Sequence, residues 1–330
     1  MSELPQAVSI REVGPRDGFQ NEPEVIPTER KIELIDALAR TGLRRLEVTS
    51  FVRADVIPQL SDAAEVLGAI DVPREVSVSV LIPNERGVDA ALELRERVRG
   101  GGRAGGTPGA DARDPGDGGR PAFDEINVFM SASETHNRKN VNRSIEESLT
   151  GLKRVLGRAR EAGLRCEGVI SVSFGCPYEG RVEPERVFAI ARRLVAAGAH
   201  EIGFGDTTGM ANPVQVRAFF EQARETLPGV ELTAHFHNTR GQGLANVYAA
   251  LEASVSSFES SFGELGGCPV PPGATGNIAT EDLVSMLHEI GIETGVDLAA
   301  LIDCTRLLQR HLGRPLGSHT LVAGPVDWHR

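Results

Sequence analysis

The sequence predicts an α/β fold: a (β/α)8 TIM barrel followed by a C-terminal helical extension. Strand-like and helix-like segments alternate eight times over roughly 250 residues, the usual span of such a barrel. Several helical segments end on glycine just before the next strand, and polar residues gather where strands end. The alternative is a doubly wound open sheet, which more often carries a G-x-G-x-x-G loop after its first strand. Val13-Gly-Pro-Arg-Asp-Gly18 lacks that pattern.

The predicted elements follow from hydrophobic spacing. The strand candidates are Val8–Val13, Arg45–Phe51, Val76–Ile82, Glu125–Ala132, Cys166–Phe174, Glu201–Asp206, Leu232–Asn238 and Ser256–Phe262. Apolar residues at spacings of three and four predict helices over Glu29–Arg40, Ser61–Ile70, Glu85–Arg97, Ile145–Ala162, Pro184–Ala197, Pro213–Thr226, Gly243–Ala253 and Thr280–Ile290.

Local signals at the helix ends agree with these boundaries. Gly163 and Gly198 suit helix C-caps, because glycine adopts the left-handed conformation found there. Ser144-Ile-Glu-Glu147 fits a capping box, and Pro184 and Pro213 suit the first helical turn.

We expect a single catalytic domain over residues 1–295 and a C-terminal extension and tail over 296–330, with a helix at Leu298–Leu312. One segment interrupts the alternation. Residues 100–119 contain nine glycines and two prolines and almost nothing that could fill a core. Such a composition cannot offset its own ordering entropy, so it predicts a flexible insertion in the barrel.

Composition excludes several classes of partner. The chain of 330 residues is 40% hydrophobic and 25% charged, and its net charge of -11 argues against binding nucleic acid. No apolar stretch approaches the roughly 20 residues that span a bilayer, and no signal peptide is visible. The four cysteines show no paired spacing, which indicates reduced thiols and a cytoplasmic location.

The most informative motif is His235-Phe236-His237 in a predicted strand. Successive strand side chains point to opposite faces, so both imidazoles project together while Phe236 packs on the other side. They form either a metal clamp or two polar residues at the end of a buried strand. Zinc in a structural role is disfavoured, because no cysteine cluster accompanies them.

Other strand ends supply matching groups. Arg16-Asp17 follows the first strand, Glu47-Val-Thr-Ser50 lies on the second, and Asp206-Thr207 ends the sixth. The loop after the eighth strand runs through Cys268 to Asn277. One aspartate, two histidines and an asparagine carbonyl make a mixed shell suited to Mg²⁺ or Mn²⁺, with positions left for water or substrate.

Seven segments in this order carry a resemblance to a known family. They are Val13-Gly-Pro-Arg-Asp-Gly-Phe-Gln-Asn-Glu22, Glu47-Val-Thr-Ser-Phe51, Phe174-Gly-Cys-Pro-Tyr-Glu-Gly180, Gly205-Asp-Thr207, His235-Phe-His237, Gly266-Gly-Cys-Pro269 and Gly276-Asn-Ile-Ala-Thr-Glu-Asp282. Together they resemble the hydroxymethylglutaryl-CoA lyase family of metal-dependent lyase and synthase barrels, typified by an Arg-Asp signature after strand one. The resemblance runs from about Val8 to about Gly295, apart from the insertion.

The resemblance implies divalent-metal-dependent cleavage of 3-hydroxy-3-methylglutaryl-CoA to acetyl-CoA and acetoacetate. It assigns the metal to Asp17, His235, His237 and Asn277. Among the catalytic residues, Arg16 would stabilise the enolate and Glu47 would orient Arg16, although both could form a merely structural pair at the barrel mouth. Cys268 would protonate the enolate, and Asp206 would act near the metal, through water or as a proton acceptor.

The chain departs from the usual family pattern at three positions near the metal. Gly203 stands in place of serine, Asn238 in place of aspartate and Arg240 in place of tyrosine. These three, with Ser50 and Thr207, are the expected substrate-binding residues, and they leave the acyl group open.

Three alternative functions therefore remain. The enzyme could cleave another 3-hydroxyacyl-CoA, such as citramalyl-CoA or a longer branched hydroxyglutaryl-CoA, or condense an acyl-CoA with a keto acid. A catalytically silent binding barrel is disfavoured, because no predicted ligand is missing. Arg138 and Lys139 could meet the CoA phosphates, although exposed basic pairs are most often just solvated. A homo-oligomer is compatible with the sequence.

Overall fold

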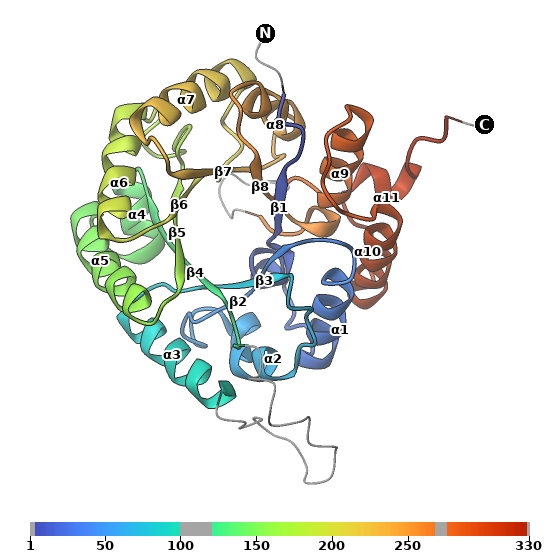
Figure 1. The fold of residues 1–330 in the computed structure, drawn as a ribbon, viewed down its shortest axis with the longest axis horizontal. Helices are drawn as coiled ribbons and strands as arrows, with labels where there is room; N and C mark the ends of the chain where they lie inside the picture. Colours follow the sequence, from blue (N-terminus) through green and yellow to red (C-terminus); the bar gives the residue numbers. More distant parts are fainter. Residues whose placement is uncertain (1–3, 100–120, 268–275, 329–330) are drawn as a thin grey trace.

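The computed structural model describes residues 4–99, 121–267 and 276–328 and confirms the predicted fold class. Eight parallel strands form a closed barrel in sequence order, and β1 pairs with β8 to complete it (Figure 1). The strands are β1 Ser9–Glu12, β2 Arg45–Ser50, β3 Ser77–Leu81, β4 Glu125–Ser131, β5 Arg165–Ser171, β6 Glu201–Asp206, β7 Glu231–Phe236 and β8 Ser257–Ser260.

Helices surround the barrel as an outer ring (Figure 1). They are α1 Thr28–Leu38, α2 Ala63–Ala69, α3 Glu85–Arg99, α4 Glu134–Val141, α5 Ile145–Glu161, α6 Pro184–Ala197, α7 Pro213–Thr226, α8 Gly243–Glu252 and α9 Thr280–Glu289. The C-terminal extension contains α10 Leu298–Leu312 and α11 His319–Ala323, and α10 packs against α1 and α9. None of the helices in these ranges is long and apolar enough to cross a membrane.

The local signals that predicted the helix ends are confirmed. Ser144 and Glu147 form both hydrogen bonds of a capping box at the start of α5. Pro184 and Pro213 lie in the first turns of α6 and α7. Gly198 caps α6 with φ of 117°, a conformation that costs glycine little because it has no Cβ.

The structure adds several short elements to the predicted set. A π-helical turn at Gly14–Gly18 (η1) follows β1 and carries Arg16 and Asp17. Helix α4 follows β4 and was not among the predicted helices. Its N-cap is Ser133, whose side chain accepts a hydrogen bond from the His136 backbone. Two further short turns, η2 Phe19–Asn21 and η4 Phe262–Glu264, flank the same end of the barrel.

The apolar core lies between the strands and the helical ring. Phe174, Phe204, Phe219 and Phe236 are buried and stack between the barrel wall and α7, with Phe174 and Phe236 centroids 5.9 Å apart. Because Phe236 packs outward, the neighbouring residues of β7 must face the barrel interior. The predicted flexible insertion at 100–119 lies outside the described residues and stays a prediction.

Candidate metal centre and active-site pocket

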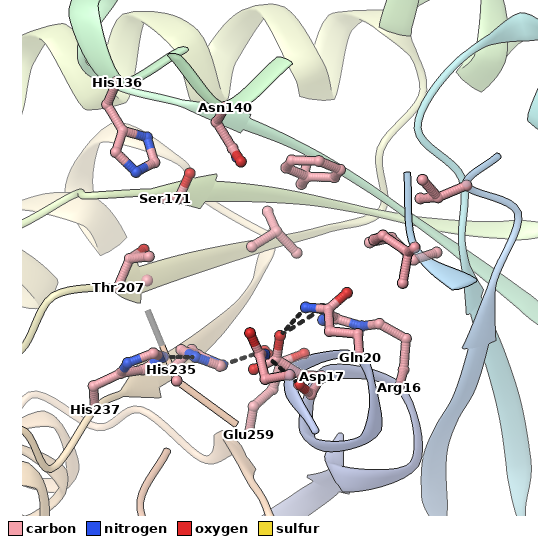
Figure 2. Close-up of a pocket in the computed structure, with 18 of the residues that line it drawn as sticks. Arg16, Asp17, Gln20, His136, Asn140, Ser171, Thr207, His235, His237 and Glu259 are labelled. Carbon is pink, nitrogen blue, oxygen red and sulfur yellow. Dashed lines mark hydrogen bonds and ion pairs between the residues drawn. The ribbon is translucent and has the colours of Figure 1, made fainter. Parts of the chain in front are cut away.

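A cavity of about 440 Å³ opens at the carboxyl ends of the strands, where barrels of this fold place their active sites. Figure 2 shows Arg16 and Asp17 from η1 facing His235 of β7 and His237 just after it, across the cavity floor. Ser171, at the end of β5, and Thr207, just after β6, lie above them, and His136 and Asn140 of α4 form the far wall. The volume suits a small-molecule site.

The two histidines converge as the strand alternation predicted. Their Nε2 atoms lie 3.1 Å apart, and both residues are largely buried. The carboxylate of Asp17 completes a group whose candidate ligand atoms all lie within 4.8 Å of one another. His237 also forms an isolated β-bridge with Asn277, which brings the loop after β8 to the same place.

Asn277 lies next to this group and is held by its amide nitrogen. Its Nδ2 donates hydrogen bonds to Asp17 Oδ2 at 2.8 Å and to the Leu265 carbonyl at 3.0 Å. Its Oδ1 is buried without a hydrogen-bond partner among the described residues. A buried polar atom left unpaired is costly unless a ligand satisfies it. Two oxygen donors and two imidazoles fit Mg²⁺ or Mn²⁺.

Two of the candidate metal ligands, His237 and Asp17, have pKa values that favour the protonation state needed to bind a cation. Burial, together with the neighbouring His235, lowers the pKa of His237 to about 3, so its ring is neutral. Burial alone would raise the pKa of Asp17, but the charges of Arg16 and His235 and the hydrogen bond from Asn277 together hold this pKa below its usual range. A neutral imidazole and an ionised carboxylate are the forms that coordinate metals.

His235 is held from behind by Glu259 on β8. Its Nδ1 lies 2.9 Å from Glu259 Oε2. Burial alone would lower the pKa of His235, but the hydrogen bond and charge of Glu259 raise it above its usual value. Burial would in turn raise the pKa of Glu259, yet His235 and Arg11 lower it to about 2, so this side chain stays a carboxylate.

Arg16 forms the ion pair with Glu47 that we expected. Its Nε donates to Glu47 Oε2 at 2.5 Å and its Nη1 to Asp17 Oδ1 at 2.7 Å. Asn127 of β4 fixes the other oxygen of Glu47 through a 2.8 Å hydrogen bond. The guanidinium is thus locked in place at the cavity floor, where Gln20 also donates to Asp17 Oδ1 at 2.8 Å.

Asp206 ends β6 with one engaged and one free carboxylate oxygen. Oδ1 accepts hydrogen bonds from the backbone of Met210 and Ala211, at 2.8 and 3.1 Å. Oδ2 is buried and unpaired among the described residues. Burial raises the pKa of Asp206 to about 7. A carboxyl group with such a pKa can exchange protons near neutrality.

The other expected substrate contacts divide into two groups. Thr207 lines the cavity, and its hydroxyl accepts a hydrogen bond from the Val172 backbone at 3.1 Å. Ser50, Gly203, Asn238 and Arg240 are not among the described residues that line it.

Each of the three departures from the family pattern has a partner away from the cavity. A Cβ at Gly203 would lie 2.7 Å from Glu167 Oε1, inside the barrel. Asn238 Nδ2 donates to Glu264 at 2.8 Å. Arg240 Nη1 donates to the carbonyls of Thr208 and Gly209, both at 2.8 Å.

The two basic residues expected to meet CoA also differ from each other. Lys139 lines the cavity, with its Nζ 5.0 Å from the centre of the Tyr178 ring. Arg138 is exposed and pairs with Glu134 on its own helix. Cys268, the expected acid, lies outside the described residues.

Sequence reasoning missed Gln20, Asn127 and Glu259. Glu259 had a signal, because a glutamate inside the short buried strand Ser257–Ser260 requires a buried partner. Gln20 and Asn127 had none, since their partners are set by the fold.

The comparisons with known proteins agree with this geometry. Residues 7–308 match the HMGL-like family. A hydroxymethylglutaryl-CoA lyase of Bacillus subtilis is 44% identical over 317 residues, which are 96% of this chain and 97% of that protein. A hydroxymethylglutaryl-CoA lyase of Pseudomonas mevalonii is 41% identical over 308 residues, 93% of each chain. An HMG-CoA lyase of Acinetobacter baumannii, solved with coenzyme A and 3-methylmalate, has a TM-score of 0.86 at 38% identity and covers 100% of this chain and 99% of its own. The chain therefore belongs to the HMGL-like family.

Proposed function

We propose that this protein is a divalent-metal-dependent carbon–carbon lyase that cleaves 3-hydroxy-3-methylglutaryl-CoA into acetyl-CoA and acetoacetate. The observation that carries the proposal is the convergence of Asp17, His235 and His237 beside Arg16 in one cavity. Relatives that match nearly the whole chain are hydroxymethylglutaryl-CoA lyases, and one of them binds coenzyme A.

The reaction must take a proton from the tertiary alcohol while negative charge develops on the thioester. A divalent metal held by Asp17, His235, His237 and Asn277 would act as a Lewis acid on the substrate oxygens. Arg16 binds the thioester oxygen and stabilises the enolate as charge accumulates there, and Glu47 keeps the guanidinium in position.

Two residues handle the protons. Asp206 is not itself among the described residues that line the cavity, but its neighbours Gly205 and Thr207 are, and it accepts the hydroxyl proton through a water molecule. The bond between C2 and C3 then breaks, its electron pair forms the enolate of acetyl-CoA, and acetoacetate is the second product. Cys268 donates a proton to C2 of the enolate, which completes acetyl-CoA. One proton is removed and one returned, so the reaction is balanced.

The remaining assignments follow from the chemistry of the described residues. Hard oxygen ligands beside two imidazoles favour Mg²⁺ or Mn²⁺. We assign a CoA phosphate to Lys139, because it is a basic residue that lines the cavity. The three described cysteines are buried and free, in keeping with a cytoplasmic location.

We propose hydroxymethylglutaryl-CoA over other 3-hydroxyacyl-CoAs because none of the three departures from the family pattern lines the described part of the cavity. Gly203 faces Glu167, and Arg240 is engaged with backbone carbonyls of the neighbouring loop. Gly203 has no side chain, and Arg240 directs its Nη1 at these carbonyls, so we assign neither residue a contact with the substrate.

A substrate panel tests the proposal. The purified protein is incubated with Mg²⁺ and either hydroxymethylglutaryl-CoA, citramalyl-CoA or a longer branched hydroxyglutaryl-CoA, and acetyl-CoA and the keto acid are both quantified. We expect equal amounts of acetyl-CoA and acetoacetate, and the highest kcat/KM for hydroxymethylglutaryl-CoA. A higher kcat/KM for another thioester would contradict the substrate assignment, and no turnover of any would contradict the lyase.

A further inference from the structure

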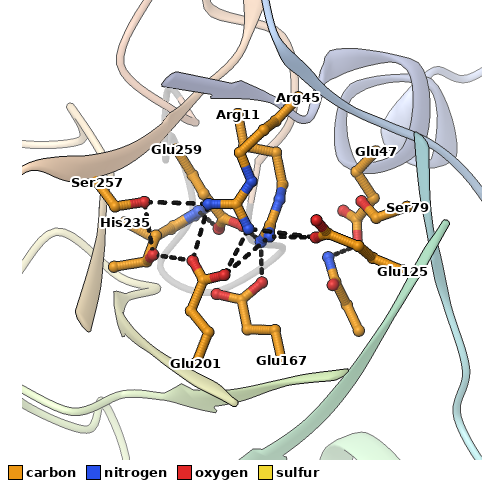
Figure 3. Close-up of polar contacts among 12 residues, drawn as sticks. Arg11, Arg45, Glu47, Ser79, Glu125, Glu167, Glu201, His235, Ser257 and Glu259 are labelled. Carbon is orange, nitrogen blue, oxygen red and sulfur yellow. Dashed lines mark hydrogen bonds and ion pairs between the residues drawn. The ribbon is translucent and has the colours of Figure 1, made fainter. Parts of the chain in front are cut away.

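Glu259 lies directly behind one of the histidines that converge on the candidate metal site. His235 and Glu259 are paired residues of the adjacent strands β7 and β8, so both side chains point into the barrel. Glu259 Oε2 is 2.9 Å from His235 Nδ1, and Glu259 is only 3% exposed (Figure 3).

The other oxygen of Glu259 is engaged by a buried arginine. Arg11 Nη1 on β1 donates to Glu259 Oε1 at 3.0 Å, and Arg11 is fully buried. Figure 3 shows its guanidinium surrounded by the carboxylates of Glu125, Glu167, Glu201 and Glu259. An arginine side chain is always cationic and can only donate hydrogen bonds. Glu259 is therefore fixed by a partner that can never accept a proton from it.

This arrangement determines the protonation of His235. A carboxylate accepts, so a neutral His235 must carry its proton on Nδ1, which leaves the lone pair on Nε2. Nε2 is the atom that faces His237 Nε2 at 3.1 Å within the candidate metal group.

We propose that Glu259, anchored by Arg11, is a positioning residue that holds His235 in the Nδ1–H tautomer with Nε2 directed at the metal. This inference rests on the metal site of the proposed function and adds a residue to it. Such partners of metal-bound histidines orient the ring and raise its basicity. Both Glu259 oxygens are occupied, so it is not free to act as the proton acceptor of the reaction.

Glutamine at this position has nearly the same shape but cannot make both contacts. With its oxygen on Arg11, its NH₂ group faces His235 Nδ1, which must then accept. The ring is driven to the Nε2–H tautomer, which cannot coordinate through Nε2. With the amide reversed, two donors meet at Arg11. Only a group with two acceptors satisfies both neighbours.

The test compares Glu259→Gln with Glu125→Gln. Glu125 contacts the same Arg11 at 3.2 Å and also Arg45 at 3.3 Å, but it lies on β4 and forms no hydrogen bond with His235 in the described part of the chain. Both variants remove one negative charge from the cluster around Arg11. Two measurements that do not depend on turnover are made: Mn²⁺ affinity by calorimetry, and the His235 tautomer by NMR of metal-free, histidine-labelled protein at a pH where the rings are neutral.

We expect Glu259→Gln to bind Mn²⁺ about 10- to 100-fold more weakly and to move the His235 proton to Nε2. Glu125→Gln should keep the wild-type tautomer and an affinity within about threefold of wild type. Unchanged affinity and tautomer in Glu259→Gln, or an equal loss in Glu125→Gln, would overturn the inference.

The wild-type protein, measured in the same two ways, separates the remaining outcomes. If Glu259→Gln does not fold, the wild-type spectrum still decides, because an Nε2–H tautomer of His235 there refutes the role of Glu259. If wild-type protein binds no divalent metal at all, the proposed metal site fails. If wild-type protein binds Mn²⁺ and Glu259→Gln binds it equally well, only the inference about Glu259 fails.

Discussion

Arg16 donates hydrogen bonds to protein carboxylates from two of its three guanidinium nitrogens, and its third nitrogen is available in the cavity. Nε binds Glu47 and Nη1 binds Asp17, and Nη2 has no partner among the described residues. Arg16→Gln should lower kcat for hydroxymethylglutaryl-CoA by about 100- to 1000-fold with little change in KM, because its contact strengthens only as the enolate forms. Steady-state kinetics at saturating Mg²⁺ provide the measurement.

A matched control is Arg154→Gln, which removes an exposed pair with Glu85 on the outer helices and should leave kcat unchanged. Bound metal must also be measured in Arg16→Gln, since Arg16 contacts Asp17. Wild-type kcat with wild-type metal content would show that Arg16 and Glu47 are only a structural pair.

The pKa of Asp206 sets a pH dependence. Burial raises this pKa to about 7, and a protonated carboxyl cannot accept the substrate proton. Activity should therefore be lost as the pH falls, with kcat/KM dropping tenfold per pH unit below the pKa and levelling above it. A bound cation would lower the pKa, so the midpoint should lie at or below about pH 7. Asp206→Asn should abolish this acid limb in the pH profile; a profile of the same shape would exclude Asp206 as the acceptor.

At the scale of single elements, β7 shows what sequence could predict. The alternation His235-Phe236-His237 depends only on strand geometry, and the structure confirms that Phe236 packs outward while both rings meet inside. His237 itself lies one residue past the strand, yet its β-bridge to Asn277 continues the extended backbone. The two-residue alternation of a strand was therefore sufficient to predict that both histidines face the same site.

Helix α4 shows why other elements escaped prediction. Its sequence is almost entirely polar, so it has no apolar period to detect. The helix depends on its ends and on tertiary contacts. Ser133 caps its start, Asn142 ends it in a left-handed conformation, and Asn137 binds backbone and side-chain groups at the start of α5.

The cluster around Arg11 escaped for a different reason. Arg11 and Glu259 are 248 positions apart and meet only when the barrel closes. The sequence does show charged residues inside buried strands, such as Glu167 in β5. It does not show which residues these charges pair with.

Gly203 in β6 gives a prediction about packing. A Cβ there would meet Glu167 Oε1 at 2.7 Å, and Glu167 is held by Arg11 in the barrel interior. Gly203→Ser should therefore lower the free energy of unfolding by about 1–3 kcal/mol through overpacking, without altering the preference among acyl-CoAs. Denaturant unfolding and kcat/KM for two thioesters measure the two effects.

Gly157→Ser in α5 is the control, because nothing lies within 4 Å of an added Cβ there. If Gly203→Ser changed the substrate preference strongly and left the stability unchanged, Gly203 would have to lie in the acyl pocket.

For the whole molecule, the candidate metal site exists only when the barrel is closed. Asp17 follows β1, the histidines come from the end of β7, and Asn277 follows β8. These three strands are neighbours because β1 pairs with β8, the contact that joins the two ends of the sheet. A chain that has not closed the barrel cannot bring residues 17 and 277 together, so a metal should bind the native state far more tightly than the unfolded one.

Metal binding should therefore raise thermal stability. At a free Mn²⁺ concentration 100 times its Kd, the native state should be stabilised by about 2.7 kcal/mol, which appears as a higher Tm in scanning calorimetry.

His237→Ala should abolish this stabilisation, because it removes a ligand, so the Tm of this variant should not respond to Mn²⁺. His288→Ala, an exposed histidine on α9 paired with Thr294, should keep the full response. Chelation should return wild-type Tm to the metal-free value and abolish cleavage, and Mg²⁺ or Mn²⁺ should restore both. A Tm that does not change with Mn²⁺ in the wild-type protein, or equal responses in both histidine variants, would show that the cation is not held at this site.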